Sequence, residues 1–323
     1  MKPLFCGSGT TPPPHSLAVD GGLAGCEASY SHWPGHPPPP DIAADTSTAI
    51  LLRAALDAKR WLSPYAWCCN DHIDCDGLLA MTLACRPELA IMHGPTMVGA
   101  AAYGDFCFWT GERAARLALR IHALIRDEQQ SGGEWEQRCC DICVTEFERL
   151  ISESEQEDEE RDAQVRQIIL IRDEFMQSEP ESLQLQTHGR FTAIHYEHHH
   201  GHHRDGPDTV YQADDCPPWA LDGHVPREHF QLLIGQHQDG RHSYQLDAPR
   251  HSWALTVHLP RIDWPDTSAV AAVLGQQDDA AWLSGDEARK LGFTCLLASS
   301  GTSRLPPDQV IAAIVKLLSA PLQ

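Results

Sequence analysis

One short segment of the chain concentrates side chains that can hold metal ions. Residues 71–77 read Asp-His-Ile-Asp-Cys-Asp-Gly and place an imidazole and two carboxylates at alternate positions, His72, Asp74 and Asp76. In extended backbone, alternate side chains share one side, so these groups are expected to converge. Nitrogen and carboxylate donors suit Mn²⁺, Fe²⁺, Zn²⁺ or Mg²⁺. Two such ions sharing a carboxylate would generate a nucleophilic hydroxide for hydrolysis.

A purely structural interpretation of this segment is a turn whose aspartates cap the following helix, because Asp is a common helix cap. The sequence around the segment predicts a strand at residues 65–69 and a helix beginning near residue 78. Gly77 is expected where the chain turns sharply from one to the other. In an open α/β sheet such a loop lies at the carboxyl end of a strand, where ligands usually bind.

The remaining pattern predicts an α/β protein. The first forty residues, rich in Gly and Pro, are expected to form a loop-like entrance. Helical spacing and alternation predict helices over about 47–61, 111–128, 144–178 and 307–318, strands at 191–195 and 253–257, and a hairpin of 230–235 with 243–246. The predicted domains are a Pro/Gly-rich segment (1–44), a metal-binding α/β domain with the acidic helical insertion at 144–178 (45–215), and a smaller α+β C-terminal region (216–323).

Residues 72–80, His-Ile-Asp-Cys-Asp-Gly-Leu-Leu-Ala, resemble the first motif of the DHH phosphoesterase superfamily. The resemblance implies a parallel sheet flanked by helices and two divalent metals, commonly manganese, that hydrolyse phosphoester or phosphoanhydride bonds. Asp105 would be the second-motif ligand. Glu197-His198-His199 would stand for the Asp-His-His signature, with glutamate in place of its aspartate.

A wider pattern resembles a bacterial domain family of unknown function, and this resemblance extends over most of the chain. It rests on residues 31–35, 45–48, 70–72 and 104–106. It implies no particular reaction.

The histidine tract at 195–203 offers further ligands, because neutral imidazole is the commonest protein ligand of transition metals. His198 is predicted to bind metal and His199 to orient a substrate oxyanion, with Asp71 as a second catalytic residue. A metal-scavenging surface loop is the alternative for the rest of the tract. His32, in a rigid Trp-Pro-Gly turn, and Arg304, in a Ser/Gly-rich loop, are predicted to bind substrate; packed or surface loops are the alternatives.

The charge and hydropathy of the sequence limit the kinds of partner that the protein is expected to bind. The net charge of −21 and pI near 5.2 repel polyanions, so duplex nucleic acid is not expected as a partner and a small anionic substrate is favoured. No apolar run reaches the roughly 20 residues needed to cross a bilayer, and no secretory signal begins the chain. The protein is therefore expected to be cytoplasmic, with its oligomeric state left open.

The sequence as a whole predicts a dinuclear metal-dependent hydrolase. Mn is the favoured metal, with Fe, Zn or Mg as alternatives, and the predicted ligands are His72, Asp74, Asp76, Asp105 and His198. Two alternatives remain. One is a mononuclear non-haem metal enzyme, an oxygenase or lyase of specialised metabolism. The other is a non-catalytic metal-binding protein.

Overall fold

The structure is a computed structural model. It describes residues 1–7, 10–175, 183–197, 218–237, 239–290, 292–298 and 301–318. The chain folds into two compact units, composed of residues 1–167 with 253–261 and of residues 168–252 with 262–323. The predicted mixed α/β class is confirmed. The predicted division into domains 1–44, 45–215 and 216–323 stays a prediction.

A four-stranded parallel sheet forms the centre of the first unit. Its strands are β1 (Lys2–Phe5), β2 (Ser16–Val19), β3 (Ala28–Tyr30) and β4 (Trp67–Asn70), in the order β1-β4-β2-β3. Every residue of β2 is buried, as expected for a parallel strand covered on both faces. Because the strands are parallel, the segments that follow β2, β3 and β4 all begin at one edge of the sheet.

Three of these strands lie in the stretch that was expected to be loop-like, and that expectation was wrong. Each strand has only three or four residues, so none is long enough to show a clear period between its Gly and Pro neighbours. Residues 37–39 do lack regular structure and lead into the 3₁₀ turn η1 (Pro40–Ile42).

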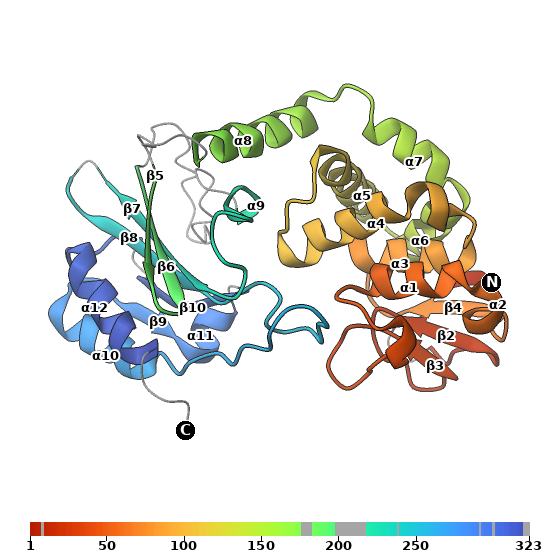
Figure 1. The fold of residues 1–323 in the computed structure, drawn as a ribbon, viewed down its shortest axis with the longest axis horizontal. Coiled ribbons are helices and arrows are strands. Elements are labelled where there is room, and N and C mark those ends of the chain that lie inside the picture. Colours follow the sequence, from red (N-terminus) through yellow and green to blue (C-terminus); the bar gives the residue numbers. More distant parts are fainter. Residues whose placement is uncertain are drawn as a thin grey trace. The chain divides into compact units, whose positions relative to one another are not determined.

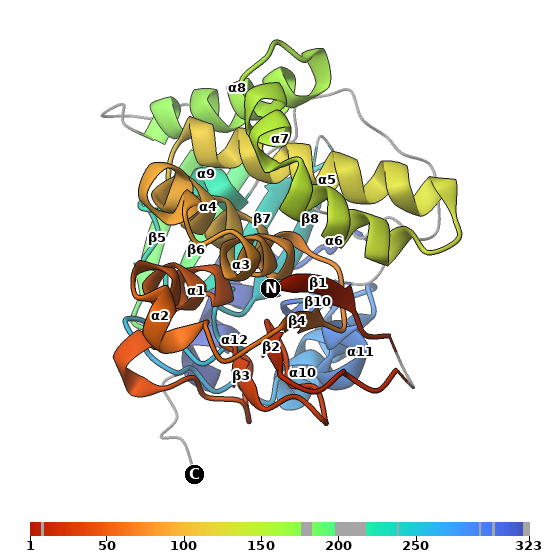
Figure 2. The ribbon, with the colours of Figure 1, turned by 90° about the vertical axis from the view of Figure 1, so that its right-hand side faces the viewer.

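Helices cover the sheet on one side, where Figures 1 and 2 show α1, α3 and α6. The helices that begin in this unit are α1 (Ser47–Leu56), α2 (Ala58–Trp61), α3 (Cys75–Cys85), α4 (Leu89–Phe106), α5 (Glu112–Ser131), α6 (Trp135–Thr145), α7 (Phe147–Ser154) and α8 (Glu159–Phe175). The helix predicted over 47–61 is divided at Asp57 into α1 and α2. The helical region predicted over 144–178 contains all of α7 and α8, with a short turn between them.

Helix α3 is the innermost helix of the first unit. Its residues from Cys75 to Ala84 are all buried, so it lacks the polar face of a surface helix. It packs against α1, α4 and α6 and touches β4. The start of α3 is therefore held rigidly beside the carboxyl end of β4.

A mixed six-stranded sheet forms the second unit. Its strands are β5 (Leu183–His188), β6 (Phe191–Glu197), β7 (Phe230–Gln236), β8 (His242–Asp247), β9 (Trp282–Ser284) and β10 (Thr294–Ala298), in the order β5-β6-β7-β8-β10-β9. The helices are α9 (Pro218–Leu221), α10 (Ser268–Gln277), α11 (Gly285–Arg289) and α12 (Pro307–Leu318). Buried residues of α10 and α12 share one apolar cluster with β7, β8 and β10.

The predicted hairpin and final helix of this unit are confirmed as antiparallel β7 and β8 and as α12. The strand predicted at 253–257 is wrong: these residues form turns and irregular backbone within the first unit. Among the described residues, no helix is both long and apolar enough to cross a membrane.

Candidate metal centre

Histidine and aspartate side chains meet at the carboxyl edge of the parallel sheet. Asp20 directly follows β2 with a left-handed backbone (φ 52°), and His32 lies two residues beyond β3. The loop that begins at Asp71, after β4, leads to α3. Ligand sites of open α/β sheets form at such an edge.

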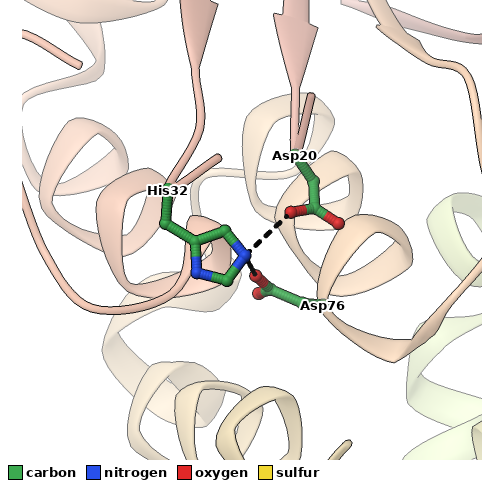
Figure 3. Close-up of side chains that lie close together, drawn as sticks. All are labelled: Asp20, His32 and Asp76. Atoms are coloured by element: carbon green, nitrogen blue, oxygen red, sulfur yellow. Dashed lines mark ion pairs between the residues drawn. The ribbon is translucent and has the colours of Figure 1, made fainter. Parts of the chain in front are cut away.

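The first group surrounds the buried imidazole of His32. Its Nε2 lies 3.3 Å from Asp20 Oδ1, 3.5 Å from Asp76 Oδ2 and 3.3 Å from Asp105 Oδ2. Figure 3 shows Asp20, from a strand end, and Asp76, from a helix, converging on this nitrogen. Its other nitrogen, Nδ1, lies 2.8 Å from the backbone oxygen of Asp45. Donation of Nδ1–H to that oxygen leaves the Nε2 lone pair of a neutral ring facing the carboxylates.

Two atoms of this first group have no hydrogen-bond partner although they are buried: His32 Nε2 and Asp105 Oδ2. The side chains of His32 and Asp76 are fully inaccessible, and that of Asp105 is 7% exposed. Buried polar atoms without partners are rare in folded proteins and call for a specific explanation such as an ion. Asp20, His32 and Asp76 are indeed placed so that their ligand atoms all lie within 4.8 Å of one another.

Asp76 also anchors helix α1. Its Oδ2 accepts a hydrogen bond from the backbone N–H of Ser47 and its Oδ1 accepts one from that of Thr48, both at 2.7 Å. These are free N–H groups of the first turn of α1, where Thr46 supplies the side-chain cap. Capping and metal binding are therefore compatible in this carboxylate, which the helix holds in place.

The second group surrounds His72. Its Nε2 lies 3.1 Å from Asp20 Oδ2 and 3.4 Å from Asp74 Oδ2, while its Nδ1 lies 2.8 Å from Asp71 Oδ1. The other oxygen of Asp74 accepts a hydrogen bond from the backbone N–H of Gly77 and so caps α3. The side chains of His72 and Asp74 are 31% and 40% exposed. In contrast to the first group, this one opens to solvent.

Asp20 belongs to both groups. Its Oδ1 faces His32 and accepts a hydrogen bond of 2.8 Å from the hydroxyl of Ser47, and its Oδ2 faces His72. The ligand atoms of Asp20, His72 and Asp74 also lie within 4.8 Å of one another. Two three-residue groups thus share one carboxylate, which is an arrangement that can bridge two ions.

The charges of the two groups are strongly coupled. Burial alone would lower the pKa of His32, but the neighbouring carboxylates of Asp20 and Asp76 raise it to about 9. The pKa of His72, which burial would likewise lower, is raised to about 11 by Asp20 and Asp74. Burial, together with the charge of Asp20, raises the pKa of Asp76 to about 6. Without an ion, protons must therefore compensate the crowded carboxylates.

The pKa of Asp20 shifts in the opposite direction. Burial would raise it, but the imidazoles of His32 and His72 beside its two oxygens hold it below its ordinary range. The pKa of Asp105 is raised well above its ordinary value by burial and then by the charge of Asp76. Asp20 is accordingly the carboxylate that stays ionised between the two imidazoles.

Two tryptophans border the groups. The ring of Trp253 lies 4.9 Å from that of His32, and the ring of Trp33 lies 5.2 Å from that of His72. The two indoles are themselves 5.1 Å apart. Trp253 belongs to the segment 253–261, which Asp45 fixes by accepting hydrogen bonds from Val257, at 2.6 Å, and His258, at 2.9 Å.

The structure changes the expected arrangement of the central motif. His72, Asp74 and Asp76 do not share one side of extended backbone, because α3 already begins at Cys75. Asp74 is the N-cap and Asp76 lies in the first turn, so helical geometry turns the two carboxylates toward different imidazoles. Gly77 is likewise inside the helix and has no positive φ, so it does not make the expected sharp turn.

The other predicted site residues fall in three places. Asp105 joins the His32 group, where His32 itself stands among carboxylates instead of at a surface. Arg304 belongs to the second unit, where its 72% exposed side chain pairs with Asp279 at 2.9 Å. His198 and His199 lie outside the described residues.

Asp20 is the functional candidate that the sequence analysis missed. It stands before two glycines in a stretch that was taken for a loop, so nothing marked it as the end of a buried strand. Recognition of the four-residue apolar strand before it would have placed its carboxylate at the same edge as His72.

A comparison with known protein families shows which family the chain belongs to. The family of unknown function DUF6687 matches residues 4–320. The chain belongs to this family. Membership of DUF6687 confirms the predicted resemblance to a family of unknown function, while the resemblance to DHH phosphoesterases stays a prediction. No curated protein and no solved structure matches this DUF6687 chain.

Proposed function

We propose that this DUF6687 protein is a dinuclear metal-dependent hydrolase that acts on a small phosphoester-like anion. The observation that supports it most directly is the shared carboxylate: the two oxygens of Asp20 face two different imidazole groups, 3.3 Å from His32 Nε2 and 3.1 Å from His72 Nε2. Carboxylate bridging of this kind holds two ions close enough to act on one substrate.

The two ion positions would have different roles. Four donor atoms surround the inner position, and their burial leaves no room for solvent. The outer position has three protein donors, from Asp20, His72 and Asp74, and faces solvent. Closed sites hold structural ions, whereas catalytic sites keep an open position for water or substrate. Bound there, the ion would supply a hydroxide at neutral pH and polarise the substrate.

The charge of the centre favours an anionic substrate. Two divalent ions would offset the four carboxylates of Asp20, Asp74, Asp76 and Asp105, so an anion at the open position would meet far less negative charge than in the metal-free centre. Asp71 supports this arrangement by holding His72 Nδ1 at 2.8 Å. Such a contact fixes the ring and strengthens its Nε2 as a ligand.

The donor types favour Mn²⁺ and weaken the mononuclear alternative. Each described group combines one imidazole with carboxylate oxygens, a set that suits Mn²⁺ and Fe²⁺ better than Mg²⁺, which prefers oxygen ligands and keeps several waters. The facial triad of non-haem oxygenases needs two imidazoles and one carboxylate. Neither of the two described groups, with His32 and with His72, contains two imidazoles.

Selective loss of ions tests the proposal. Asp20→Asn is expected to abolish binding at both positions, because its carboxylate serves both, whereas Asp74→Asn should lose only the outer ion. Asp41→Asn is the matched control, since Asp41 is an exposed partner of Arg60. Elemental analysis should give two ions per chain for the wild type and for Asp41→Asn. It should give one ion for Asp74→Asn and none for Asp20→Asn. Hydrolysis of generic phosphomonoesters and phosphodiesters should fall at least about 100-fold in the first two variants.

The alternatives predict other outcomes. A mononuclear enzyme would bind one ion in the wild-type protein. A non-catalytic metal-binding protein would retain its ions in Asp20→Asn if the histidine tract held them, or would bind two ions and hydrolyse nothing in the substrate panel. Either result contradicts the proposed hydrolase.

A further inference from the structure

Asn70, the last residue of β4, carries a buried amide whose direction is fixed. Its Oδ1 accepts hydrogen bonds from the backbone N–H groups of Asp71, at 2.8 Å, and His72, at 3.5 Å. These contacts distinguish the amide oxygen from the nitrogen, because only the oxygen can accept. The side chain is fully buried, and its Nδ2 has no hydrogen-bond partner among the described residues. Burying such a donor unpaired costs about 1–3 kcal/mol.

The unpaired nitrogen lies beside the outer ion position. A Cβ atom at Gly77 would be 2.2 Å from Asn70 Nδ2, 3.0 Å from Asp20 Oδ2 and 3.1 Å from Asp74 Oδ1. The amide nitrogen and two carboxylate oxygens therefore surround the same point on α3. Gly77 has ordinary helical backbone, so the space it leaves for this amide, and not a special φ, explains the glycine.

The two oxygens of Asp20 are supported unequally. Ser47 donates its hydroxyl to Oδ1 at 2.8 Å and keeps that contact whether or not an ion is present. Oδ2 meets His72 Nε2, an atom that would instead bind the outer ion. A carboxylate that bridges two ions needs both oxygens held in place, and partners behind the ligands commonly do this.

We propose that Asn70 is the positioning residue of the shared carboxylate, its Nδ2 donating to Asp20 Oδ2 when the outer position holds an ion. The inference rests on the proposed dinuclear site. Ser47 then holds Oδ1 of Asp20 and Asn70 holds Oδ2. Loss of such a partner typically weakens metal binding 10–100-fold, and here only the outer ion should be affected.

Mn²⁺ titration of the full chain, followed by electron paramagnetic resonance, tests this role. Asn70→Ala removes the donor, and Gly77→Ala displaces it without changing residue 70. Gly275→Ala is the matched helical control, because its added Cβ meets only Trp282, at 4.0 Å. Both site variants should bind the inner ion as the wild type does and the outer ion 10–100-fold more weakly. The spectrum of two coupled ions should give way to that of a single ion.

Each result decides a separate question. The positioning role is overturned if Gly77→Ala and Asn70→Ala bind both ions with wild-type affinity. It is also overturned if both ions are weakened equally, because a general packing defect would produce that result. If Asn70→Ala does not fold, Asn70→Ser, which removes the amide nitrogen and keeps a small oxygen acceptor, decides in its place. Two ions in the wild type without hydrolysis would contradict the proposed function and leave the role of Asn70 standing. Fewer than two ions in the wild type would overturn both.

Discussion

Single carboxylates in this centre perform two tasks at once. Asp74 caps α3 with one oxygen and faces His72 with the other, and Asp76 accepts two backbone N–H groups of α1 while it faces His32. The backbone thus fixes the carboxylates before any ion arrives. Ligands ordered in advance lose less conformational entropy on binding, which favours affinity.

The crowded charges predict how pH affects the metal-free protein. His32 and Asp76 have raised pKa values, about 9 and about 6, so the folded state holds protons that the unfolded state has released. Stability then falls as pH rises. The Asp76 contribution is lost between pH 4 and 6 and the His32 contribution between pH 6.5 and 9. The contribution of His72, whose pKa is raised to about 11, is lost between pH 6.5 and 11. Asp20, whose pKa is lowered, matters only in more acidic solution.

Urea denaturation in the presence of EDTA measures this effect. We expect the free energy of unfolding to fall by ~2 kcal/mol between pH 6 and pH 9. His32→Gln should make this decline smaller and leave the part that His72 contributes. His15→Gln should not, because His15 is an exposed residue paired with Glu27. Equal slopes in the wild type and His32→Gln would show that His32 is not protonated in the metal-free protein.

At the level of residues, the sequence indicated part of the centre. His72, Asp74, Asp76 and Asp105 all lie in the two groups because each stands in a recognisable local pattern. The division of these residues between two imidazoles could not be predicted, since it depends on α3 beginning at Cys75 and not after Gly77. The helix starts about three residues earlier than expected, and each helical residue turns the side-chain direction by about 100°.

Helix α1 shows at the level of elements how packing and site are connected. Its first turn receives two different acceptors: the Thr46 hydroxyl, which caps Ala49 N–H within the helix, and the Asp76 carboxylate from α3. The first is local to one helix. The second ties two helices together next to the proposed inner ion.

Two variants separate these contributions. Thr46→Ala should lower the free energy of unfolding by about 1 kcal/mol, the usual cost of a lost cap, and leave both ions bound. Asp76→Ala should cost more, roughly 2–4 kcal/mol, because two buried N–H groups lose their acceptor, and it should also lose the inner ion. Chemical denaturation and elemental analysis of the same preparations measure both effects. Loss of the inner ion in Thr46→Ala would contradict this separation.

The elements themselves were predictable where they were long or sharply bounded. The hairpin of β7 and β8 and the helix α12, which begins at Pro307, carried clear turn and capping signals. The strands β1, β2 and β3 did not, because three or four residues cannot display a period. The parallel pairing of β1 and β2 with β4 depends on contacts distant in sequence, which no local pattern specifies.

At the scale of the whole molecule, the chain passes between the two units more than once. It leaves the first unit after residue 167, returns for residues 253–261, and then completes the second unit. The returning segment is held by Asp45 and by a hydrogen bond of 2.7 Å from Leu255 N–H to the backbone oxygen of His32. The neighbourhood of the proposed inner ion therefore includes residues from a late part of the sequence.

Release of this segment should be measurable. Asp45→Ala removes the acceptor of the Val257 and His258 N–H groups and is expected to lower the free energy of unfolding by about 2 kcal/mol. Trypsin should then cleave after Arg261 several-fold faster than in the wild type, and the fluorescence of Trp253 should shift to longer wavelength. Asp57→Ala, at the exposed junction of α1 and α2, is the control. Unchanged cleavage would show that other contacts hold the segment.

Because the chain returns to the first unit at residues 253–261, that unit can be completed only late in synthesis. A ribosome exposes β1 to α7 long before it has made residues 253–261. The residues of the His32 group are therefore translated early, and Trp253, which lies against His32, is added late. Until then Phe106 lacks its indole neighbour Trp253, and the nascent first unit presents an uncovered apolar face. A gene fragment that ends near residue 167 would retain that defect permanently. The first unit is thus a contiguous body in space that no contiguous stretch of messenger RNA encodes.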